Sequence, residues 1–350
     1  MGGNALKQIG IETERKGAKE YHVISKDVLH KLCILFPNRK IAITKAYANK
    51  ESFGDCDILL ESDNLPNEWI DLVSYALNNS PYVSNGDVVS FCYMNLQIDI
   101  IKTKSELFTI AEVYFAFNDL GNLMGRIAHR IGFKYGQDGL WLRLIEGTEV
   151  IAKIHVSSNP FEIFRFLGYK YEVFKEGFNT LEDVFKFAVS SEYFNKEIFY
   201  LENRNHKARV RDMKRPSYMA FLEWIKDIDV PNKHPLHKSE EKIVIEKAVF
   251  LNMAFSKFPG LIDKYLAAIK THENNKQAKL LWNGKVVSDI TGLQDKDLGA
   301  FIKFCKDTKM KELETSDPNV FTNWVIEQTE FHIKAFVLYC LEKYNNSAKT

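Results

Sequence analysis

The sequence predicts an α+β protein, in which a small mixed sheet with helices on one face is followed by an all-helical region. Up to about residue 155, short strand-like runs alternate with helical ones, and beyond that point strand patterns nearly vanish while helical periodicity continues. The chain of 350 residues is 45% hydrophobic, which is enough for two or three domains with sizeable cores. We therefore expect a sheet-bearing domain over residues 1–155 and helical structure over 156–350.

The first domain alternates between hydrophobic runs of strand length and helical patterns. The expected elements are, in order, a helix near 26–36, a strand near Ile41, a strand over 52–60, a helix over 67–78, strands near Val88 and Ile98, an amphipathic helix over 118–130, and a hairpin over 140–156 that turns at Glu146 and Gly147. This order of short strands and helices predicts one small sheet rather than a long parallel one.

Helical periodicity fills most of the second half. The expected helices cover 160–168, 181–189, 216–226, 240–258, 261–270, 297–306 and 319–343. Two prolines and polar neighbours make 229–236 a candidate linker, so a boundary inside the helical region is expected there. The sequence shows no internal repeat and no low-complexity tract.

Charge and cysteine content limit the classes of function. The formal net charge is only +1, so a nucleic-acid partner would have to be bound by a local basic patch. The five cysteines are scattered and no pair has zinc-ligand spacing, which indicates free thiols in a reducing cytosol, buried at Cys56 and Cys92. We find neither a signal-peptide pattern nor an apolar run of membrane-spanning length, so a cytoplasmic protein without a membrane partner is expected.

Three aspartates carry the strongest chemical signal. Asp55 and Asp57 project from the same side of one expected strand, because side chains alternate along a strand, and Asp99 lies on another with apolar residues on both sides. Since a buried unpaired charge is costly, a bound divalent cation is the plausible compensation. Three oxygen donors suit Mg²⁺, especially when a nucleoside triphosphate supplies further ligands in a two-metal arrangement. The alternative is a set of solvated aspartates, since Gly54 before Asp55 is ordinary turn chemistry.

This pattern resembles the DNA polymerase beta superfamily of nucleotidyltransferases over roughly residues 36–104. Gly54-Asp55-Cys56-Asp57 with its aliphatic tail carries the resemblance, together with the aliphatic-Asp99-aliphatic strand about forty residues later. The superfamily includes CCA-adding enzymes, poly(A) polymerases and antibiotic adenylyltransferases. The resemblance implies a palm-like head in which Asp55, Asp57 and Asp99 are the catalytic residues and bind two Mg²⁺ ions, with Mn²⁺ as an alternative. It also implies that Asp99 lies at the attacking hydroxyl.

One part of the superfamily pattern is missing. Members usually carry Gly-Ser about ten residues before the acid pair, where backbone amides hold the triphosphate, and Thr44 and Lys45 stand there in this chain. Lys45 with its neighbouring amides, and Gly54 beside the acid pair, are therefore candidates for nucleotide binding. Gly2 and Gly3 are further candidates, because glycine lacks a Cβ and lets the backbone approach a phosphate closely. The alternative is that these two glycines are an ordinary chain start.

The expected helix over 118–130 carries a polar face. Asn118, Asn122 and Arg126 recur every four residues, so on a helix they lie on one side. Two amides and an arginine suit the ribose, base edge or phosphates of a nucleotide, whereas a plain exposed surface would more often carry Glu and Lys. We predict these three residues to bind the nucleotide, with an ordinary solvated surface as the alternative.

A basic segment over 204–215 is the only dense positive patch in the sequence. It carries the side chains of Arg204, Lys207, Arg209, Arg211, Lys214 and Arg215, and Tyr218 and Trp224 follow it. One interpretation is a nucleic-acid site, in which the cations follow the phosphate backbone and the aromatic rings stack on bases. A second is a solvated, partly salt-bridged segment with both rings buried. A third is a binding site for the nucleotide's triphosphate.

Two further resemblances bear on the acceptor. Residues 282–301 resemble the tail of bacterial-type CCA-adding enzymes and poly(A) polymerases, which holds RNA, although two glycine-capped helices would give a similar pattern. The Arg-Arg-Asp-Phe motif of those enzymes is absent, and residues 117–136 instead resemble uncharacterised phage and viral nucleotidyltransferase-like proteins. These resemblances imply an enzyme, in a bacterial host cytoplasm if phage-encoded, that adds nucleotides from an NTP to an RNA 3′ end, such as that of tRNA, and releases pyrophosphate. The alternatives are transfer to a protein or small molecule and a catalytically degenerate RNA-binding module.

Overall fold

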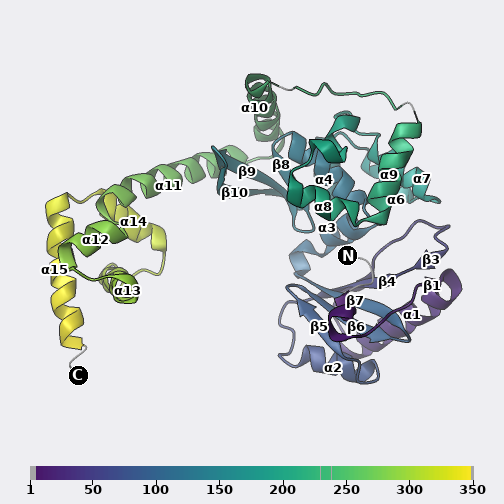
Figure 1. The fold of residues 1–350 in the computed structure, drawn as a ribbon, viewed down its shortest axis with the longest axis horizontal. Helices are drawn as coiled ribbons and strands as arrows, with labels where there is room; N and C mark the ends of the chain where they lie inside the picture. Colours follow the sequence, from purple (N-terminus) through teal and green to yellow (C-terminus); the bar gives the residue numbers. More distant parts are fainter. Residues whose placement is uncertain (1–4, 229, 238, 348–350) are drawn as a thin grey trace. The chain divides into compact units, whose positions relative to one another are not determined.

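A computed structural model describes residues 5–228, 230–237 and 239–347. Contacts group the chain into two compact units. Unit 1 consists of the residues up to 143 together with 155–259, and unit 2 consists of 144–154 together with the residues from 260 onward. Strands are concentrated in the N-terminal half and helices in the C-terminal half, so the α+β prediction is confirmed at that level (Figure 1).

A five-stranded mixed sheet organises the first part of unit 1. Its order is β2 (Ile41–Ile43), β4 (Asp55–Glu61), β7 (Leu96–Thr103), β6 (Val88–Tyr93) and β5 (Tyr82–Asn85). β4 and β7 are parallel and the other neighbouring pairs are antiparallel. Two short strands, β1 (Lys16–Gly17) and β3 (Ser52–Phe53), pair separately just before β4. The short edge strand β5 was not among the predicted elements.

One face of this sheet is covered by α1 (Ala18–Leu35) and α2 (Trp69–Ala76). The alternation along β4 places Cys56, Ile58 and Leu60 on that face, where they are fully buried against helical residues. Ile98 and Ile100 of β7 join the same core. In Figure 1 the sheet lies between α2 on one side and the helices that follow β7 on the other.

The opposite face is only partly covered by apolar side chains. Leu59 and Ile101 pack there against Phe108 and Ala111 of α3 (Phe108–Phe115), which follows β7 through a 3-10 turn at Ser105–Leu107. The odd-numbered positions nearer the starts of β4 and β7 belong to this same face. The three aspartates therefore lie on the sheet face that points away from α1 and α2.

The rest of unit 1 is mainly helical. The helices are α4 (Leu120–Arg130), α5 (Pro160–Phe166), α6 (Tyr171–Glu176), α7 (Leu181–Ala188), α8 (His206–Met213), α9 (Pro216–Asp227) and α10 (Glu240–Lys257). A second sheet has the order β10-β9-β8, built from β8 (Phe133–Gly136), β9 (Gly139–Glu146) and β10 (Glu149–Ser157), and its residues 144–154 belong to unit 2. The predicted hairpin over 140–156 is the β9–β10 pair.

Glycine allows the close approach of α3 to α4. A Cβ built on Gly121 would lie 2.2 Å from the backbone oxygen of Tyr114, at the end of α3. No side chain can be accommodated at that distance, so the sharp connection between the two helices depends on this residue. The connection sets the start of α4 at Leu120, two residues later than predicted.

The predicted division at residue 155 falls within β10, and the helices from α5 to α10 belong to the same compact unit as the first sheet. The candidate linker near 229–236 connects α9 to α10 inside unit 1; residue 229 lies outside the described residues. No helix in the described part of the chain combines the length and apolar character needed to cross a membrane. All five thiols are free, with Cys56 buried as predicted, Cys92 half-buried and Cys33 exposed.

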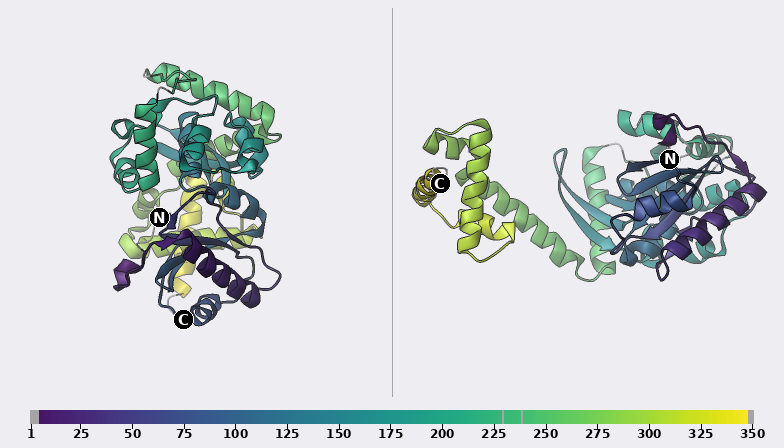
Figure 2. Two further views of the ribbon diagram at one scale, coloured as in Figure 1. Left: turned by 90° about the vertical axis from the view of Figure 1, so that its right-hand side faces the viewer. Right: turned by 90° about the horizontal axis from the view of Figure 1, so that it is seen from below.

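Unit 2 is a helical bundle. Its helices are α11 (Leu261–Leu281), α12 (Gly284–Thr291), α13 (Asp295–Glu312), α14 (Pro318–Ile326) and α15 (Glu330–Ser347), seen from two further sides in Figure 2. The single helix predicted over 319–343 is wrong, because the chain breaks between α14 and α15. Gln328 Nε2 donates to the carbonyl of Trp324, and the Thr329 hydroxyl accepts from the amide of His332, so both helix ends are satisfied by side chains.

Candidate metal centre

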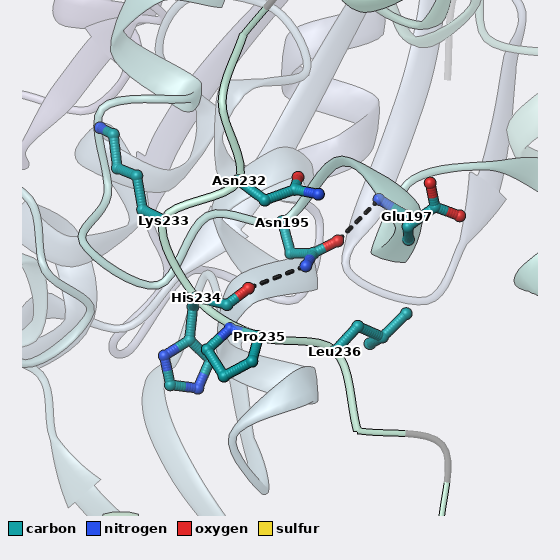
Figure 3. Close-up of a pocket in the computed structure, with 7 residues that line it drawn as sticks. All are labelled: Asn195, Glu197, Asn232, Lys233, His234, Pro235 and Leu236. Atoms are coloured by element: carbon teal, nitrogen blue, oxygen red, sulfur yellow. Dashed lines mark hydrogen bonds between the residues drawn. The ribbon is translucent and has the colours of Figure 1, made fainter.

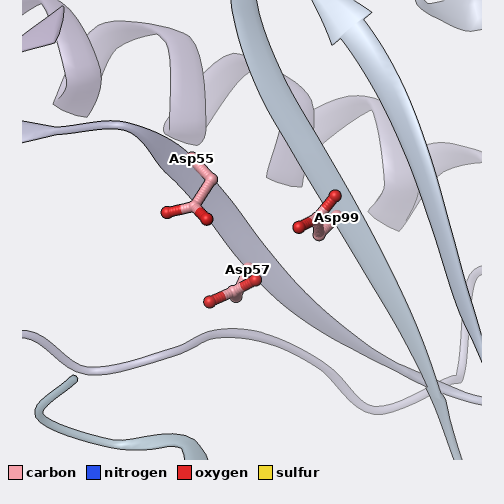
Figure 4. A group of neighbouring side chains, drawn as sticks. All are labelled: Asp55, Asp57 and Asp99. Carbon is pink, nitrogen blue, oxygen red and sulfur yellow. The ribbon is translucent and has the colours of Figure 1, made fainter. Parts of the chain in front are cut away.

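The acidic cluster consists of Asp55, Asp57 and Asp99. In the parallel pairing of β4 with β7, Asp57 lies directly opposite Asp99, and Asp55 lies opposite Gln97. Each aspartate offers an oxygen that lies within 4.8 Å of the oxygens offered by the other two (Figure 4). The alternation of side chains along the two strands thus brings three carboxylates to one place, as the sequence predicted.

The charged forms of Asp57 and Asp99 are disfavoured. Burial, together with the neighbouring charges of Asp55 and Asp99, raises the pKa of Asp57 to about 7. Burial also raises the pKa of Asp99 to about 6, although hydrogen bonds from Ser90 and Gln97 act in the opposite direction. Near neutral pH, the cluster therefore gains from any bound cation or proton that neutralises its charge.

Gln97 fixes the orientation of the Asp99 carboxylate. Its Nε2 lies 2.9 Å from both carboxylate oxygens of Asp99, and the residue itself is only 1% exposed. The other end of the amide accepts a 3.1 Å hydrogen bond from the backbone amide of Ala5. Metal ligands are commonly oriented by a hydrogen bond from a neighbouring residue, and the buried Gln97 amide makes such a contact with the Asp99 carboxylate.

These residues fit a divalent cation. Carboxylate oxygens are the preferred ligands of Mg²⁺ and Mn²⁺, and three of them converge on one region. Mutual repulsion and burial destabilise the ionised cluster, and a cation removes both penalties. Asp55, Asp57 and Asp99 could therefore hold one or two such ions.

The loop between β2 and β3 lies beside the cluster. The amide of Thr44 donates to the carbonyl of Asp57, and the carbonyl of Lys45 accepts from the amide of Phe117 at 2.7 Å. The Lys45 side chain is exposed. Further along the loop, Lys50 is half-buried, and its Nζ donates to Asn118 Oδ1 at 3.0 Å. The loop thus joins the sheet to the chain segment that leads into α4.

Asn118 is not on the predicted helical face. It precedes α4, with a φ of 62°, and Phe117 before it has a φ of 57°. Left-handed backbone of this kind is tolerated by asparagine and is unusual for phenylalanine. The Phe117 ring packs edge-on against Phe174 and Phe178, which fixes this conformation. The prediction that Asn118 shares a helix face with Asn122 and Arg126 is therefore wrong.

Arg126 lies in the interior. Only 8% of its surface is exposed, and its guanidinium donates to Asp212 Oδ2 at 2.6 Å. Asn122 is half-buried, and its Nδ2 is a buried atom without a hydrogen-bond partner among the described residues. The structure therefore gives Arg126 a structural partner on α8 instead of placing it on an open nucleotide-binding face.

Half of the basic segment is engaged in ion pairs within unit 1. Asp212 is fully buried and contacts Arg126, Arg204 and Arg211, while Arg215 pairs with Asp119 at 2.6 Å. A carboxylate at this depth requires such partners, because its desolvation is costly. These contacts favour the salt-bridged interpretation for Arg204, Arg211 and Arg215.

The remaining cations of the basic segment are more accessible. Lys207 and Lys214 are exposed and Arg209 is half-buried. The two aromatic rings are not a stacking surface: Tyr218 is fully buried with its hydroxyl donating to the carbonyl of Phe199, and Trp224 is half-buried against Phe185 and Phe221.

The remaining predicted positions are placed as follows. Gly54 lies under the side chain of Arg15, whose guanidinium nitrogen would be 2.9 Å from a Cβ built on it. Gly2 and Gly3 lie outside the described residues. Residues 282–301 form α12 and the start of α13 around Gly292, which has a φ of 73°, and Trp282 and Phe301 are buried in the core of unit 2. Gly292 caps the end of α12, whereas α13 begins after Gln294 and ends at Leu313 without a glycine cap.

Two cavities in unit 1 lie elsewhere. One, of about 510 Å³, is lined by Asn195, Glu197 and residues 232–236, where Asn195 donates to the carbonyl of His234 and accepts from the amide of Glu197 (Figure 3). The other, of about 810 Å³, has aromatic walls that include Tyr171 and Phe178. Neither is lined by a residue of the acidic cluster.

Sequence reasoning missed Gln97, Lys50 and Arg15. Gln97 could have been found, because it is two residues before Asp99 on the same strand and must share its face. Lys50 and Arg15 lie in irregular segments without periodicity, so only the folded chain brings them near the cluster. Comparison of the chain with models of known protein families and with curated protein sequences gives no match.

Proposed function

We propose that the protein is a metal-dependent nucleotidyltransferase that moves a nucleotide from an NTP to the 3′ end of an RNA and releases pyrophosphate. One observation carries the proposal: three carboxylates from two adjacent parallel strands offer oxygens within 4.8 Å of one another on an incompletely covered sheet face. A purely structural role would leave three mutually repelling acids without a reason to converge.

The topology around the cluster supports the same proposal. The acid pair begins β4, the third acid lies opposite on β7, and both strands belong to a small mixed sheet backed by α1 and α2. This is the arrangement expected for the palm-like head of the DNA polymerase beta superfamily, to which the Gly-Asp-x-Asp pattern bears its resemblance. The proposed palm fold accounts for why the acid pair at the start of β4 lies beside the acid of β7.

Asp55 and Asp57 would hold two Mg²⁺ ions, and Asp99 would complete the site. Bound ions of this kind neutralise a triphosphate and make a hydroxyl easier to deprotonate. Asp99, which accepts hydrogen bonds from Gln97, would accept the proton of the attacking 3′ hydroxyl. The hydroxyl oxygen forms its bond to the α-phosphorus while the bond from that phosphorus to the bridging oxygen breaks, and pyrophosphate leaves with the electron pair.

The basic segment bears on the identity of the acceptor. Lys207, Arg209 and Lys214 remain available for a phosphate backbone, and they support RNA. The internal ion pairs of Arg204, Arg211 and Arg215 reduce the basic surface, and this observation favours a second candidate, transfer to a protein or small molecule.

The test is a transfer assay with each α-³²P-labelled NTP, Mg²⁺, and total RNA, DNA or lysate protein as the acceptor. Label in RNA supports the first candidate, and label in protein supports the second. The matched control is Asp57→Asn, which keeps the size of the side chain and removes its charge. The proposal is rejected if no acceptor is labelled with either Mg²⁺ or Mn²⁺, or if the folded control variant transfers as much label as the wild type.

A further inference from the structure

A lysine beside the acidic cluster has a defined position but forms no ion pair with another described residue. Lys50 precedes β3, and its Nζ lies 4.5 Å from the centre of the Phe53 ring. In the sequence, Phe53 is two residues before Asp55. That ring is stacked on Tyr21 of α1 at 3.7 Å, so it is a fixed surface. The lysine is therefore held at the point where the chain enters β4.

The hydrogen-bond partner of Lys50 is neutral. Its Nζ donates to Asn118 Oδ1 at 3.0 Å, and an amide oxygen orients an ammonium group without cancelling its charge. Burial lowers the pKa of Lys50, while the negative charges of Asp55 and Asp57 oppose that effect. The charges of both acids therefore favour the ammonium form of Lys50, against the effect of burial.

Asn118 lies in a segment whose backbone conformation is unfavourable. Phe117 and Asn118 both have positive φ. The conformation of Phe117 is held by its ring contacts and by the hydrogen bond that its backbone amide donates to the carbonyl of Lys45. On the other side, the amides of Ala48 and Asn49 donate to the carbonyls of Phe178 and Asn179. The loop that carries Lys50 is therefore anchored both to Phe117 and to the segment 178–179.

We propose that Lys50, positioned by Asn118, binds the triphosphate of the nucleotide at the acidic cluster. The inference rests on the proposed function. The Gly-Ser motif that would hold the triphosphate is missing, and Lys50 is a second candidate for this role near the acids, besides Lys45. A lysine ammonium is a compact point charge well suited to phosphate, and cations bound by the aspartates would attract the same group from the other side. Asn118 acts as a positioning residue, since it touches the lysine and not the substrate.

The test measures the binding of the four α,β-methylene nucleoside triphosphates with Mg²⁺ by calorimetry, so that no transfer is required. Lys50→Met retains the packing on Phe53 and is expected to weaken binding about tenfold to a hundredfold, as for loss of a charged hydrogen bond. Lys50→Arg should retain most of the affinity, and Asn118→Ala should lie between them. Lys31→Met is the matched control. Lys31 also lies over a ring, that of Tyr93, and it forms an ion pair with Asp27.

Two further readouts separate the possible causes. Mn²⁺ affinity without nucleotide should not fall in Lys50→Met, since removal of a positive charge does not weaken a cation site. The inference is overturned if the wild type binds none of the analogues, or if Lys50→Met binds them as tightly as the wild type does. Analogue binding that depends on Lys50 in a protein that transfers no label would retain this assignment and reject the proposed reaction.

Discussion

Asp57 on β4 and Asp99 on β7 occupy directly paired positions of two parallel strands. Both side chains lie on the face that α1 and α2 leave uncovered, and each carboxyl has a raised pKa, about 7 for Asp57 and about 6 for Asp99, chiefly because of burial. A pairing that costs stability in this way needs a ligand to balance it.

The metal-free protein should lose stability as pH rises from 5 to 8. Asp57 and Asp99 both have a folded pKa above the usual value of 3.8, so the folded state holds more protons than the unfolded state in this range. Their contribution is complete below about pH 4 and is lost as pH rises through 6 and 7. We expect a change of about 3–4 kcal/mol in the free energy of unfolding, measured by urea titration in EDTA, since each pKa unit is worth about 1.4 kcal/mol.

The control for this pH effect is Asp57→Asn, in which the slope between pH 5 and 8 should be much smaller. Excess Mg²⁺ should reverse the effect at pH 8, since a ligand at one hundred times its dissociation constant stabilises by about 2.7 kcal/mol. Equal slopes in the two proteins would show that the acidic cluster is not the cause.

Gln97→Met should weaken cation binding by about 10- to 100-fold, the usual cost of losing a residue that supports a metal ligand. The substitution removes the two hydrogen bonds to Asp99 with little change in volume. Calorimetric titration with Mn²⁺ measures the effect. Tyr93→Phe is the control, because its hydroxyl donates to Asp27 and not to the cluster, and its affinity should match the wild type. An unchanged affinity in Gln97→Met would contradict the orienting role.

Asp212→Ala should destabilise unit 1 by about 3–5 kcal/mol, because it leaves Arg126 and Arg204 buried without their anion. Thermal or urea unfolding measures the loss. The comparison variant is Asp227→Ala at the exposed end of α9, which should stay within about 0.5 kcal/mol of the wild type. Equal stability of the two variants would indicate that the arginines of the basic segment do not depend on Asp212 and are available to bind a ligand.

Local patterns predicted much of the fold. The strand period of two placed Asp55 and Asp57 on one face, and helical periodicity located the main helices of the second half. α3 was missed because its run of residues 108–115 is apolar on nearly every side and has little periodicity. The helix predicted from 118 starts at Leu120 because Phe117 and Asn118 adopt left-handed backbone, a choice made by the tertiary packing of the Phe117 ring.

Long-range partners explain what the sequence could not reveal about the candidate site. Arg126 lies on the predicted side of a helix, but its ion pair joins residues 86 positions apart, so its burial cannot be inferred from helical spacing. The same holds for Lys50 and Asn118, which are 68 positions apart. Asp55 and Asp57 were predictable because alternation along a strand is local, and Asp99 because the apolar residues on both sides of it mark a strand position.

We infer that Asp55, Asp57 and Asp99 together bind divalent cations, and Mn²⁺ binding tests this inference. Calorimetric titration of wild type and Asp57→Asn at pH 8, with matched unfolding curves to verify the fold, gives the required comparison. We expect the wild type to bind Mn²⁺ and the folded variant to lose most of that affinity. A wild type that binds no Mn²⁺ at millimolar concentration, or a variant that binds it equally well, would contradict the claim.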